Sequence, residues 1–410
     1  MENNNNALSP VLLQNRIVSL DVLRGFAILG ILIMNIQSFS MIQAAYLNPT
    51  AYGNLTGINL LVWLLSHIFA DQKFLSLFSI LFGAGIVLFC EKAEEKGRKP
   101  FALHLRRNFW LLIIGMIHAY VFWYGDILVP YAVSAFIAYP FRRKSPKTLL
   151  IAGSIIFLVP VFLYLLFGFS LSFWSEQDIN NTMQGWAPSP ETIETEINAL
   201  QSGLLTQIRY RIPAAIAMQT FIYFIWYGWR IIALMFFGMA FYKLRIITGD
   251  RTPAFYLRMT LAGFLIGFPL ILWGVFNNFA NGWSLQYSMF IGSQFNYVGS
   301  LFVALGYLAL VVSWSRTSRN LLTDRLTSTG RLAFSNYLGQ TLICTFIFYG
   351  HGLALFGRLE RWQQFLLVPV ILGFQLFLFS PLWLKYFRFG PVEWLWRSLT
   401  YLKFQPLRRS

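Results

Sequence analysis

Charged residues are scarce in this chain: Asp, Glu, Lys and Arg make up only 12% of its 410 residues. An average soluble domain has about 25%. Hydrophobic residues reach 57% and aromatic residues 18%, and so little charge could not cover the surface of a soluble globule. The composition therefore excludes a disordered chain, a coiled coil and a soluble α/β enzyme, and it predicts an integral membrane protein.

Cysteine is nearly absent, and so are the common catalytic motifs. Cys90 and Cys344 both lie within apolar runs, so no disulfide framework and no metal site is expected. The chain has no P-loop, no GxSxG and no HExxH motif, which argues against ATP-driven transport by this chain alone. Its basic residues and aromatics follow the expected membrane boundaries, so no nucleic-acid binding is expected.

Ten apolar runs approach or exceed the length of about 20 residues that a membrane-spanning helix needs. They predict an all-α fold, a polytopic transmembrane helix bundle with about ten spanning helices, at residues 17–41, 74–91, 105–124, 126–141, 148–170, 220–243, 255–277, 294–314, 330–350 and 363–384. The fourth run is short and the sixth is hard to delimit, so nine or eleven spans stay open. No cleavable signal peptide is expected, because the first run is long and begins with Asp21 and Arg24.

The distribution of the basic residues predicts the orientation. The net charge is +16, and if the N-terminus is cytoplasmic, 26 of the 32 Lys and Arg residues fall in cytoplasmic segments. Cytoplasmic loops of membrane proteins are enriched in Lys and Arg. We therefore expect both termini in the cytoplasm and a chain that crosses its membrane several times.

The order of the apolar runs predicts five regions. Ser189 before Pro190, followed by acidic residues, is typical of a capped helix start, so an amphipathic helix is expected in the long segment outside the cytoplasm. The regions are a disordered tail at 1–15, a five-helix membrane unit at 16–170, the extracytoplasmic segment at 171–211, a C-terminal membrane unit at 212–400 and a basic cytoplasmic tail at 401–410.

Ionisable residues inside apolar helices are costly, so they mark candidate sites. His118 lies 12 residues after Arg106, about 18 Å along a helix, and Asp126 follows at a Gly-Asp break. Because imidazole transfers protons near neutral pH, we predict His118 as a catalytic base, oriented by Asp126 or Asn35. A structural histidine that bonds a neighbouring helix is the alternative.

Four further clusters have either a binding role or a structural one. Their members are candidates for substrate or donor binding because they are polar groups at or within spans; long side chains at a span boundary can also snorkel towards water. Residues three or four apart share a helix face, which predicts an ion pair between Glu393 and Arg397. The candidates are Asp21, Arg24, Asp71, Gln72, Lys73, Asn336, Gln340, Glu393 and Arg397.

Two structural expectations follow from these positions. Isolated burial would leave polar groups unpaired, so one connected cavity is expected to be lined by Asp21, Arg24, Asn35, His118, Asp126 and Gln340. Gly83 and Gly85 are expected to permit close approach of a neighbouring helix.

Five strings carry a resemblance to a known family. In order along the chain they are RIVSLDVLRGFAILGILIMNI, ADQKFLSLFSILFGAGI, GMIHAYVFWYGDILVPYA, GRLAFSNYLGQ and FGPVEWLWR. They resemble the YeiB family of bacterial membrane proteins over nearly the whole chain, which implies a multi-pass protein of the bacterial cytoplasmic (inner) membrane. The resemblance implies a C-terminal domain of unknown function, numbered 418, from near residue 225 to about 400, and it implies no particular reaction.

The first spans are also similar to those of transmembrane acyltransferases such as the lysosomal heparan-α-glucosaminide N-acetyltransferase. Asp21, Arg24 and Gly25 match that group's opening motif, and Asn35 matches an asparagine near its reaction centre. The catalytic histidine that follows in that group is missing, because residues 36–66 contain none, and His118 would have to replace it.

This similarity implies a cytoplasmic acyl-CoA or acetyl-CoA donor and a sugar, lipid or other small-molecule acceptor outside the cytoplasm. A transporter or exporter of a small or amphiphilic solute and a non-enzymatic membrane protein are the alternatives. Membrane lipids are expected partners, and a homodimer is left open.

Overall fold

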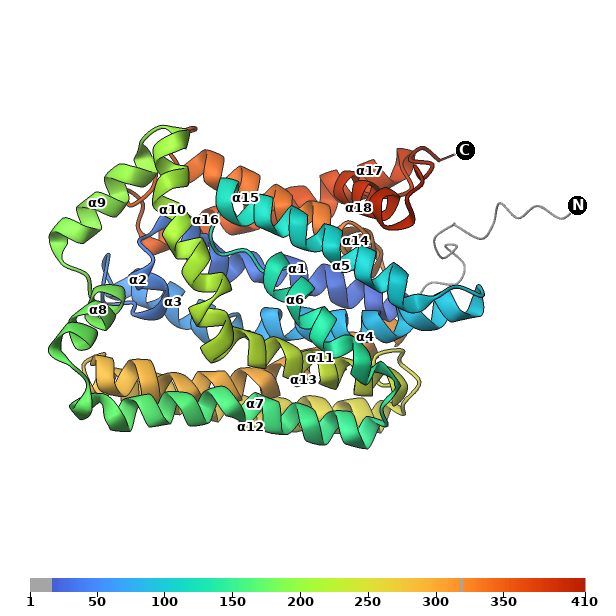
Figure 1. The fold of residues 1–410 in the computed structure, drawn as a ribbon, viewed down its shortest axis with the longest axis horizontal. Helices are drawn as coiled ribbons and strands as arrows, with labels where there is room; N and C mark the ends of the chain where they lie inside the picture. The colour runs from blue at the N-terminus through green and yellow to red at the C-terminus, as the bar shows by residue number, and fades with distance from the viewer. Residues whose placement is uncertain (1–16, 318–319, 410) are drawn as a thin grey trace, which may run out of the picture.

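The computed structural model describes residues 17–317 and 320–409, and the elements in these residues are helices (Figure 1). The predicted tail at 1–15 lies outside the described residues. Seven helical stretches in the described part are long and apolar enough to cross a membrane. They are Val18–Ser40, Gly57–Glu95, Pro146–Phe173, Leu204–Lys243, Pro253–Ala280, Leu285–Thr317 and Arg361–Tyr386, and each contains or matches a predicted span.

The other three predicted spans coincide with shorter helices that run along the bundle in Figure 1. The spans at 105–124, 126–141 and 330–350 overlap α5 (Pro100–Ile117) with the π-helix η3 (His118–Phe122), α6 (Leu128–Ala138) and α15 (Ala333–Phe348). The membrane character is thus established, while the total of ten crossings stays a prediction.

The remaining elements complete the bundle. They are α1 (Val18–Ser40), α2 (Ala44–Leu47), α3 (Gly57–Phe69), α4 (Lys73–Glu95), η4 (Tyr139–Arg143), α7 (Pro146–Ser170), η5 (Leu171–Phe173), α8 (Glu176–Trp186), α9 (Pro190–Gln201), α10 (Leu204–Gln219), η6 (Tyr223–Tyr227), α11 (Gly228–Lys243), α12 (Pro253–Ala280), η7 (Leu285–Gly292), α13 (Ser293–Thr317), α14 (Leu321–Arg331), α16 (Arg361–Gly373), η8 (Phe374–Phe379), α17 (Ser380–Tyr386) and α18 (Pro391–Tyr401).

Glycines set two close helix crossings in the core. A methyl group at Gly238 of α11 would overlap the carbonyl oxygen of Ile80 on α4, and one at Gly83 would overlap that of Met235. The expectation for Gly83 is therefore confirmed. Because α11 also packs against α7, the regions predicted at 16–170 and 212–400 share one core.

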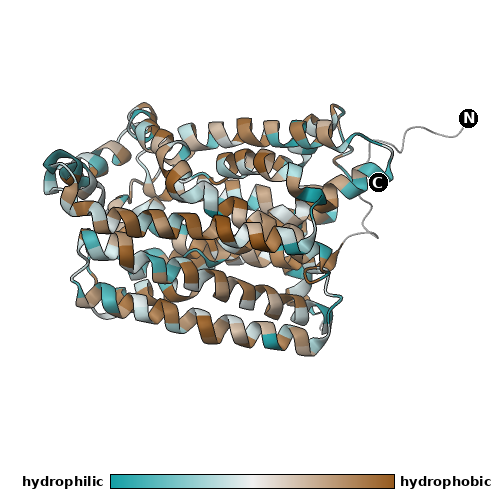
Figure 2. Ribbon diagram, turned by 60° about the horizontal axis from the view of Figure 1, so that its bottom comes forward, coloured by the Kyte–Doolittle hydropathy of each residue, from teal (hydrophilic) through white to brown (hydrophobic). Residues whose placement is uncertain are grey.

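The lipid-facing side of the bundle is apolar. Helices α7 and α12 are largely exposed and present side chains such as Ile155, Phe162, Leu265 and Phe276. Figure 2 shows hydrophobic residues along the length of the bundle and hydrophilic residues gathered at its two ends. A membrane-embedded side surface between two wet ends follows from this pattern.

The two ends differ in what they carry. One holds α8 and α9, and the other holds α14, α17, α18 and the C-terminus (Figure 1). Ile17, before α1, and Tyr401, at the end of α18, line the same pocket. Both ends of the described chain therefore lie on one side of the bundle, in agreement with the expected common side of the termini.

The segment predicted outside the cytoplasm is mostly helical. The capped helix start at Ser189 is confirmed, since its hydroxyl accepts a 3.3 Å hydrogen bond from the Thr192 N–H. A further helix, α10, begins at Leu204 within the predicted segment and continues past residue 211 to Gln219. Arg211 on α10 is buried and donates a 2.6 Å hydrogen bond to the Val121 carbonyl.

The segment predicted as a basic cytoplasmic tail, 401–410, is hydrogen-bonded to the bundle over its described residues. The Arg388 N–H donates to the Leu407 carbonyl at 2.8 Å, and the Arg409 N–H donates to the Tyr386 carbonyl at 3.0 Å. The tail therefore closes the end of the bundle on which α18 lies.

Labelling of single cysteines tests the orientation. We expect Glu191→Cys on α9 to react with a membrane-impermeant thiol reagent added outside intact cells, and Lys99→Cys to react only after the membrane is opened. Both positions are exposed, whereas the native Cys90 and Cys344 are buried and give little background. Labelling of Glu191→Cys from the cytoplasmic side alone would contradict the orientation.

The buried carboxyl of Glu196 on α9 is expected to make the stability of the folded protein depend on pH. Its side chain is buried and accepts a 3.0 Å hydrogen bond from the Gln43 N–H, and burial raises its pKa to about 7. Because the native carboxyl holds its proton more tightly than the unfolded one, stability falls as pH rises from about 4.5 to about 7. Each unit by which the pKa differs between the folded and the unfolded state changes the free energy of unfolding by about 1.4 kcal/mol.

Glu196→Gln should remove this pH dependence, since an amide still accepts the hydrogen bond and carries no charge. We expect the variant to unfold at a higher temperature than the wild type at pH 8, and at nearly the same temperature at pH 4.5. Thermal unfolding in lipid nanodiscs at both pH values measures this. Equal shifts at the two pH values would mean that ionisation of Glu196 is not the cause.

Candidate functional site

A pocket of about 290 Å³ opens at the end of the bundle that carries α18. Its walls come from α1, α4, α5, α6, α14, α15 and α18. Two acidic residues line it, Asp21 and Glu393, against a larger set of basic ones. The basic lining residues are Arg24, Lys92, Lys96, Arg98, Arg107, Arg331 and Arg397.

Gly85 and Gly330 line the pocket, and Gly25 lies against Gly330 beside it. A methyl group at Gly25 would overlap the carbonyl oxygen of Leu326, and one at Gly330 would overlap that of Asp21, so α1 and α14 cross in direct backbone contact. Gly85 was expected to permit close approach of a neighbouring helix, but it faces the pocket instead. Its nearest neighbour is Arg24, whose Nη2 would lie 3.8 Å from an added methyl group.

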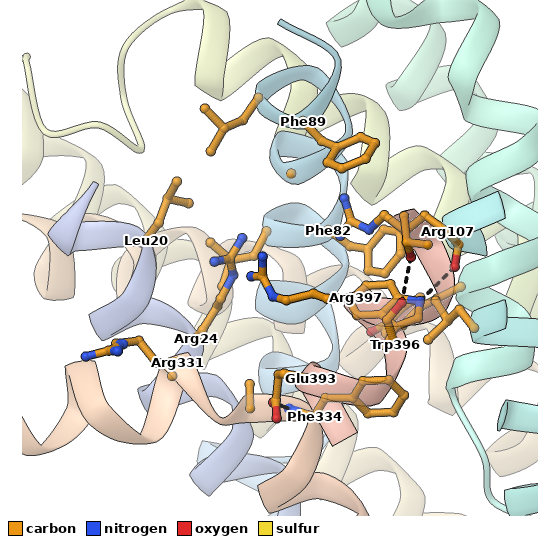
Figure 3. A pocket seen from close by; sticks show the side chains of 18 of the residues that line it. Leu20, Arg24, Phe82, Phe89, Arg107, Arg331, Phe334, Glu393, Trp396 and Arg397 are labelled. Carbon is orange, nitrogen blue, oxygen red and sulfur yellow. Dashed lines mark hydrogen bonds between the residues drawn. The ribbon is translucent and has the colours of Figure 1, made fainter. Parts of the chain in front are cut away.

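Arg107 of α5 stands in the pocket among aromatic rings. Its guanidinium lies 4.8 Å from the ring centre of Phe89 and 4.7 Å from that of Trp396. The Trp396 indole N–H donates to the Arg107 carbonyl at 2.7 Å (Figure 3). Arg107 forms no ion pair with a carboxylate of the described residues, so its charge is held by aromatic faces, as in cation–π contacts.

Arg24 and Arg397 converge on the same space from α1 and α18 (Figure 3). The predicted contact of Asp21 with Arg24 is present, at 3.3 Å between Oδ1 and Nη1. Arg397 lies 4.9 Å from the ring centre of Phe389. A guanidinium group can bind two oxygens of one phosphate or carboxylate through two parallel N–H bonds.

Glu393 has a structural role although it lines the pocket. Its carboxylate accepts hydrogen bonds from the N–H groups of Phe334, at 2.7 Å, and Ser335, at 3.0 Å, and from the Ser335 hydroxyl. These N–H groups belong to the first turn of α15, which a carboxylate stabilises. Burial raises the pKa of Glu393, and the bonds from Ser335 and Phe334 offset part of that effect.

His118 and Asp126 form a buried pair beside the inner end of the pocket. His118 Nδ1 lies 2.7 Å from Asp126 Oδ1, and His118 Nε2 lies 2.9 Å from the hydroxyl of Thr341. Tyr337 and Ile127 line the pocket and adjoin the pair: the Tyr337 ring centre is 5.2 Å from that of His118, and Ile127 follows Asp126 in the chain. His118 begins the π-helical turn η3, a widened turn that is frequent at functional sites.

The expected single cavity is found only in part. Asp21 and Arg24 line the pocket, whereas His118, Asp126 and Gln340 are buried outside it. Asn35 is half-buried, and no hydrogen bond joins it to His118 among the described residues. Of the two residues predicted to orient the imidazole, Asp126 therefore does so and Asn35 does not.

Asn336 and Gln340 connect helices and do not line the pocket. The Asn336 amide donates to the Ser380 hydroxyl at 3.0 Å, and the Gln340 amide donates to the Gln375 side chain at 2.9 Å and to the Ile28 carbonyl at 3.3 Å. Their predicted common face is thus directed at η8 and α17. Such polar contacts hold membrane helices together.

Asp71, Gln72 and Lys73 lie at the break between α3 and α4, away from the pocket. Gln72 has φ 62°, and Lys73 points inward, with no exposed surface. Its ammonium donates to the His67 carbonyl at 2.7 Å and to Asn296 at 2.8 Å. The expectation that Lys73 snorkels is wrong, because the break leaves carbonyls at the end of α3 that need a donor.

Two residues with central positions were not singled out from the sequence. Arg107 was counted only among the cytoplasmic basic residues, and Thr341 was not considered. Arg107 follows Arg106 in a basic run, so only its inward position distinguishes the two. Thr341 had a weak signal, because it lies four residues after Tyr337, on one helix face.

The bundle defines a multi-pass α-helical membrane protein, and its pocket is lined by more basic than acidic residues. The chain is 34% identical to the uncharacterized protein YeiB of Escherichia coli, over 94% of this chain and 96% of that one. It is 32% identical to the uncharacterized protein YxaH of Bacillus subtilis, over 98% and 99% of the two chains.

The chain belongs to the YeiB family. A family model described as a protein of unknown function, DUF418, matches residues 241–403, so this domain begins later than the expected position near residue 225. No solved structure matches the chain.

Proposed function

We propose that this protein transfers an acyl group from a cytoplasmic acyl-CoA to a hydroxyl or amine of a cell-envelope sugar or lipid. The observation that carries the proposal is the basic pocket whose inner end, at Tyr337 and Ile127, lies against the His118–Asp126 pair. An acyl-CoA has a polyanionic head group and an apolar acyl chain, which match the basic mouth and the apolar inner end of the pocket.

Each part of the pocket has a role in this reaction. Lys92, Lys96 and Arg98 near the mouth attract the phosphates, and Arg24 and Arg107 deeper inside hold them by charge-assisted hydrogen bonds. Phe78, Leu81 and Leu128 line the pocket with apolar surface for the acyl chain. His118, oriented by Asp126, takes the proton of the attacking group.

Binding of a long-chain acyl-CoA to the protein in lipid nanodiscs tests the donor site. Arg107→Gln should raise Kd by about 10- to 100-fold, because a hydrogen bond to a charged group contributes about 1.5–3 kcal/mol. Arg251→Gln is the matched control: it removes one positive charge outside this pocket, near the Phe255 ring. Equal binding by both variants, or no binding by the wild type, would count against the proposal.

Transfer itself is measured in inside-out membrane vesicles that contain the protein. Radiolabelled acyl-CoA supplied on the cytoplasmic face should give labelled envelope sugar or lipid together with free CoA thiol. If vesicles that contain the protein and saturating acyl-CoA give no labelled acceptor, that result would contradict acyl transfer.

Transport of an anionic amphiphile is the second candidate, and one observation favours it. Residues 57–95 form one apolar helical stretch that breaks at Gln72 beside the buried Asp71 and Lys73. Broken helices with buried charges are typical of transporter binding sites. Flux of intact acyl-CoA or of another anionic solute into sealed vesicles, without release of CoA thiol, would favour this candidate.

A further inference from the structure

Thr341 on α15 is a buried hydroxyl whose contact is unusual for a helix threonine. Such side chains commonly bond to a backbone carbonyl three or four residues earlier. Thr345, one turn further on, does so at 3.3 Å to the Leu342 carbonyl. Thr341 is equally buried, but its Oγ1 lies 2.9 Å from His118 Nε2.

The partners of His118 determine the direction of these hydrogen bonds. An ionised Asp126 only accepts, so Nδ1 of His118 carries the proton and Nε2 of the neutral ring is an acceptor. The Thr341 hydroxyl therefore donates to Nε2. The second oxygen of Asp126 is fixed by the Val129 N–H at 2.7 Å. A carboxylate, an imidazole and a hydroxyl in this order form the arrangement that activates a hydroxyl for attack.

Thr341 is also placed next to the pocket. Ala333 and Tyr337 line the pocket from α15, and Thr341 follows four residues after Tyr337 on the same face. One helical turn, about 5.4 Å along the axis, thus separates the hydroxyl from the innermost pocket residue of this helix.

We propose that Thr341 is the nucleophile of the acyl transfer, which then proceeds through an acyl-threonine intermediate. This inference rests on the proposed function. Thr341 Oγ1 attacks the thioester carbonyl of the acyl-CoA while its proton passes to His118 Nε2. The C–S bond breaks, the CoA sulfur takes that proton, and CoA leaves as a thiol.

The second half of the reaction restores the enzyme. The acceptor hydroxyl or amine attacks the ester carbonyl of acyl-Thr341, and its proton passes to His118 Nε2. The ester C–O bond breaks, Thr341 Oγ1 recovers the proton, and the acylated acceptor leaves. Asp126 stabilises the imidazolium in both halves without changing its own protonation.

The test uses the full chain in lipid nanodiscs with radiolabelled decanoyl-CoA as probe, quenched in acid without acceptor. We expect one acyl group per chain, mapped by mass spectrometry to the peptide that contains Thr341. Thr341→Val should carry no label and should lose transfer by about 10⁴-fold or more, since loss of a triad nucleophile removes most of the catalysis. Thr341→Ser should still be acylated.

Thr345→Val is the matched control, because it removes an equally buried hydroxyl from the same helix without touching His118. It should keep both acylation and transfer. If Thr341→Val does not fold, mapping of the label on the wild type and on Thr341→Ser decides.

The outcomes separate the two proposals. Transfer by the wild type with no acylated Thr341, or undiminished transfer by Thr341→Val, would overturn the threonine nucleophile and leave acyl transfer standing. A wild type that neither releases CoA thiol nor labels an acceptor would overturn both.

Discussion

His118→Ala is expected to lower acyl transfer by about 10²–10⁴-fold, the usual cost of losing a positioned base, while the protein still inserts and folds. The imidazole bridges Asp126 on one side and Thr341 on the other, so its removal takes the base away from the Thr341 hydroxyl. The loss of interhelical hydrogen bonds costs only about 0.6–2 kcal/mol each in a membrane.

His104→Ala is the matched control for this variant. His104 lies on the same helix, is also buried, and bonds to the Ala135 carbonyl at 3.1 Å, but it touches neither the pocket nor the pair. We expect it to lose stability and keep transfer activity per folded molecule. A folded His118→Ala protein with undiminished transfer would exclude the catalytic role, and thermal unfolding beside the transfer assay distinguishes these results.

Gly238→Ala is expected to produce the largest loss of stability for a single added methyl group. The new carbon would overlap the Ile80 carbonyl oxygen and lie 3.0 Å from the Ala84 nitrogen. Both are backbone atoms of α4, so the clash is relieved only if α4 and α11 move apart. Overpacking of this kind costs about 1–3 kcal/mol and occasionally more, which exceeds the gain of about 1 kcal/mol from replacing glycine in a helix.

Gly373→Ala on α16 provides the comparison, because an added methyl group there meets no atom within 4 Å. We expect this variant to be at least as stable as the wild type. Thermal unfolding in the same detergent or nanodisc measures both. A Gly238→Ala protein as stable as Gly373→Ala would show that the crossing of α4 and α11 does not need the glycine.

Contacts between site residues were foreseen where they depend on local sequence spacing, and not where they depend on which helices pack together. The pair of His118 with Asp126 was foreseen because both lie near one chain reversal, and the contact of Asp21 with Arg24 because it follows from helix spacing. Thr341 and Arg107 were not foreseen, because their roles depend on which helix lies opposite. Glu393 was a candidate, but its bond to the Ser335 N–H, 58 residues away in the sequence, was not foreseen for the same reason.

The membrane class, the positions of the apolar helices and the capped start at Ser189 were determined by the sequence alone, because each depends on local composition or on hydrogen bonds within a few residues. The tertiary structure decided which polar groups face the pocket and which hold helices together. Asn336, Gln340 and Lys73 are all polar groups in apolar surroundings, and nothing local distinguishes them from Arg24. Their roles differ because a buried polar group bonds to whatever the packing places beside it, and packing brings together residues far apart in the chain.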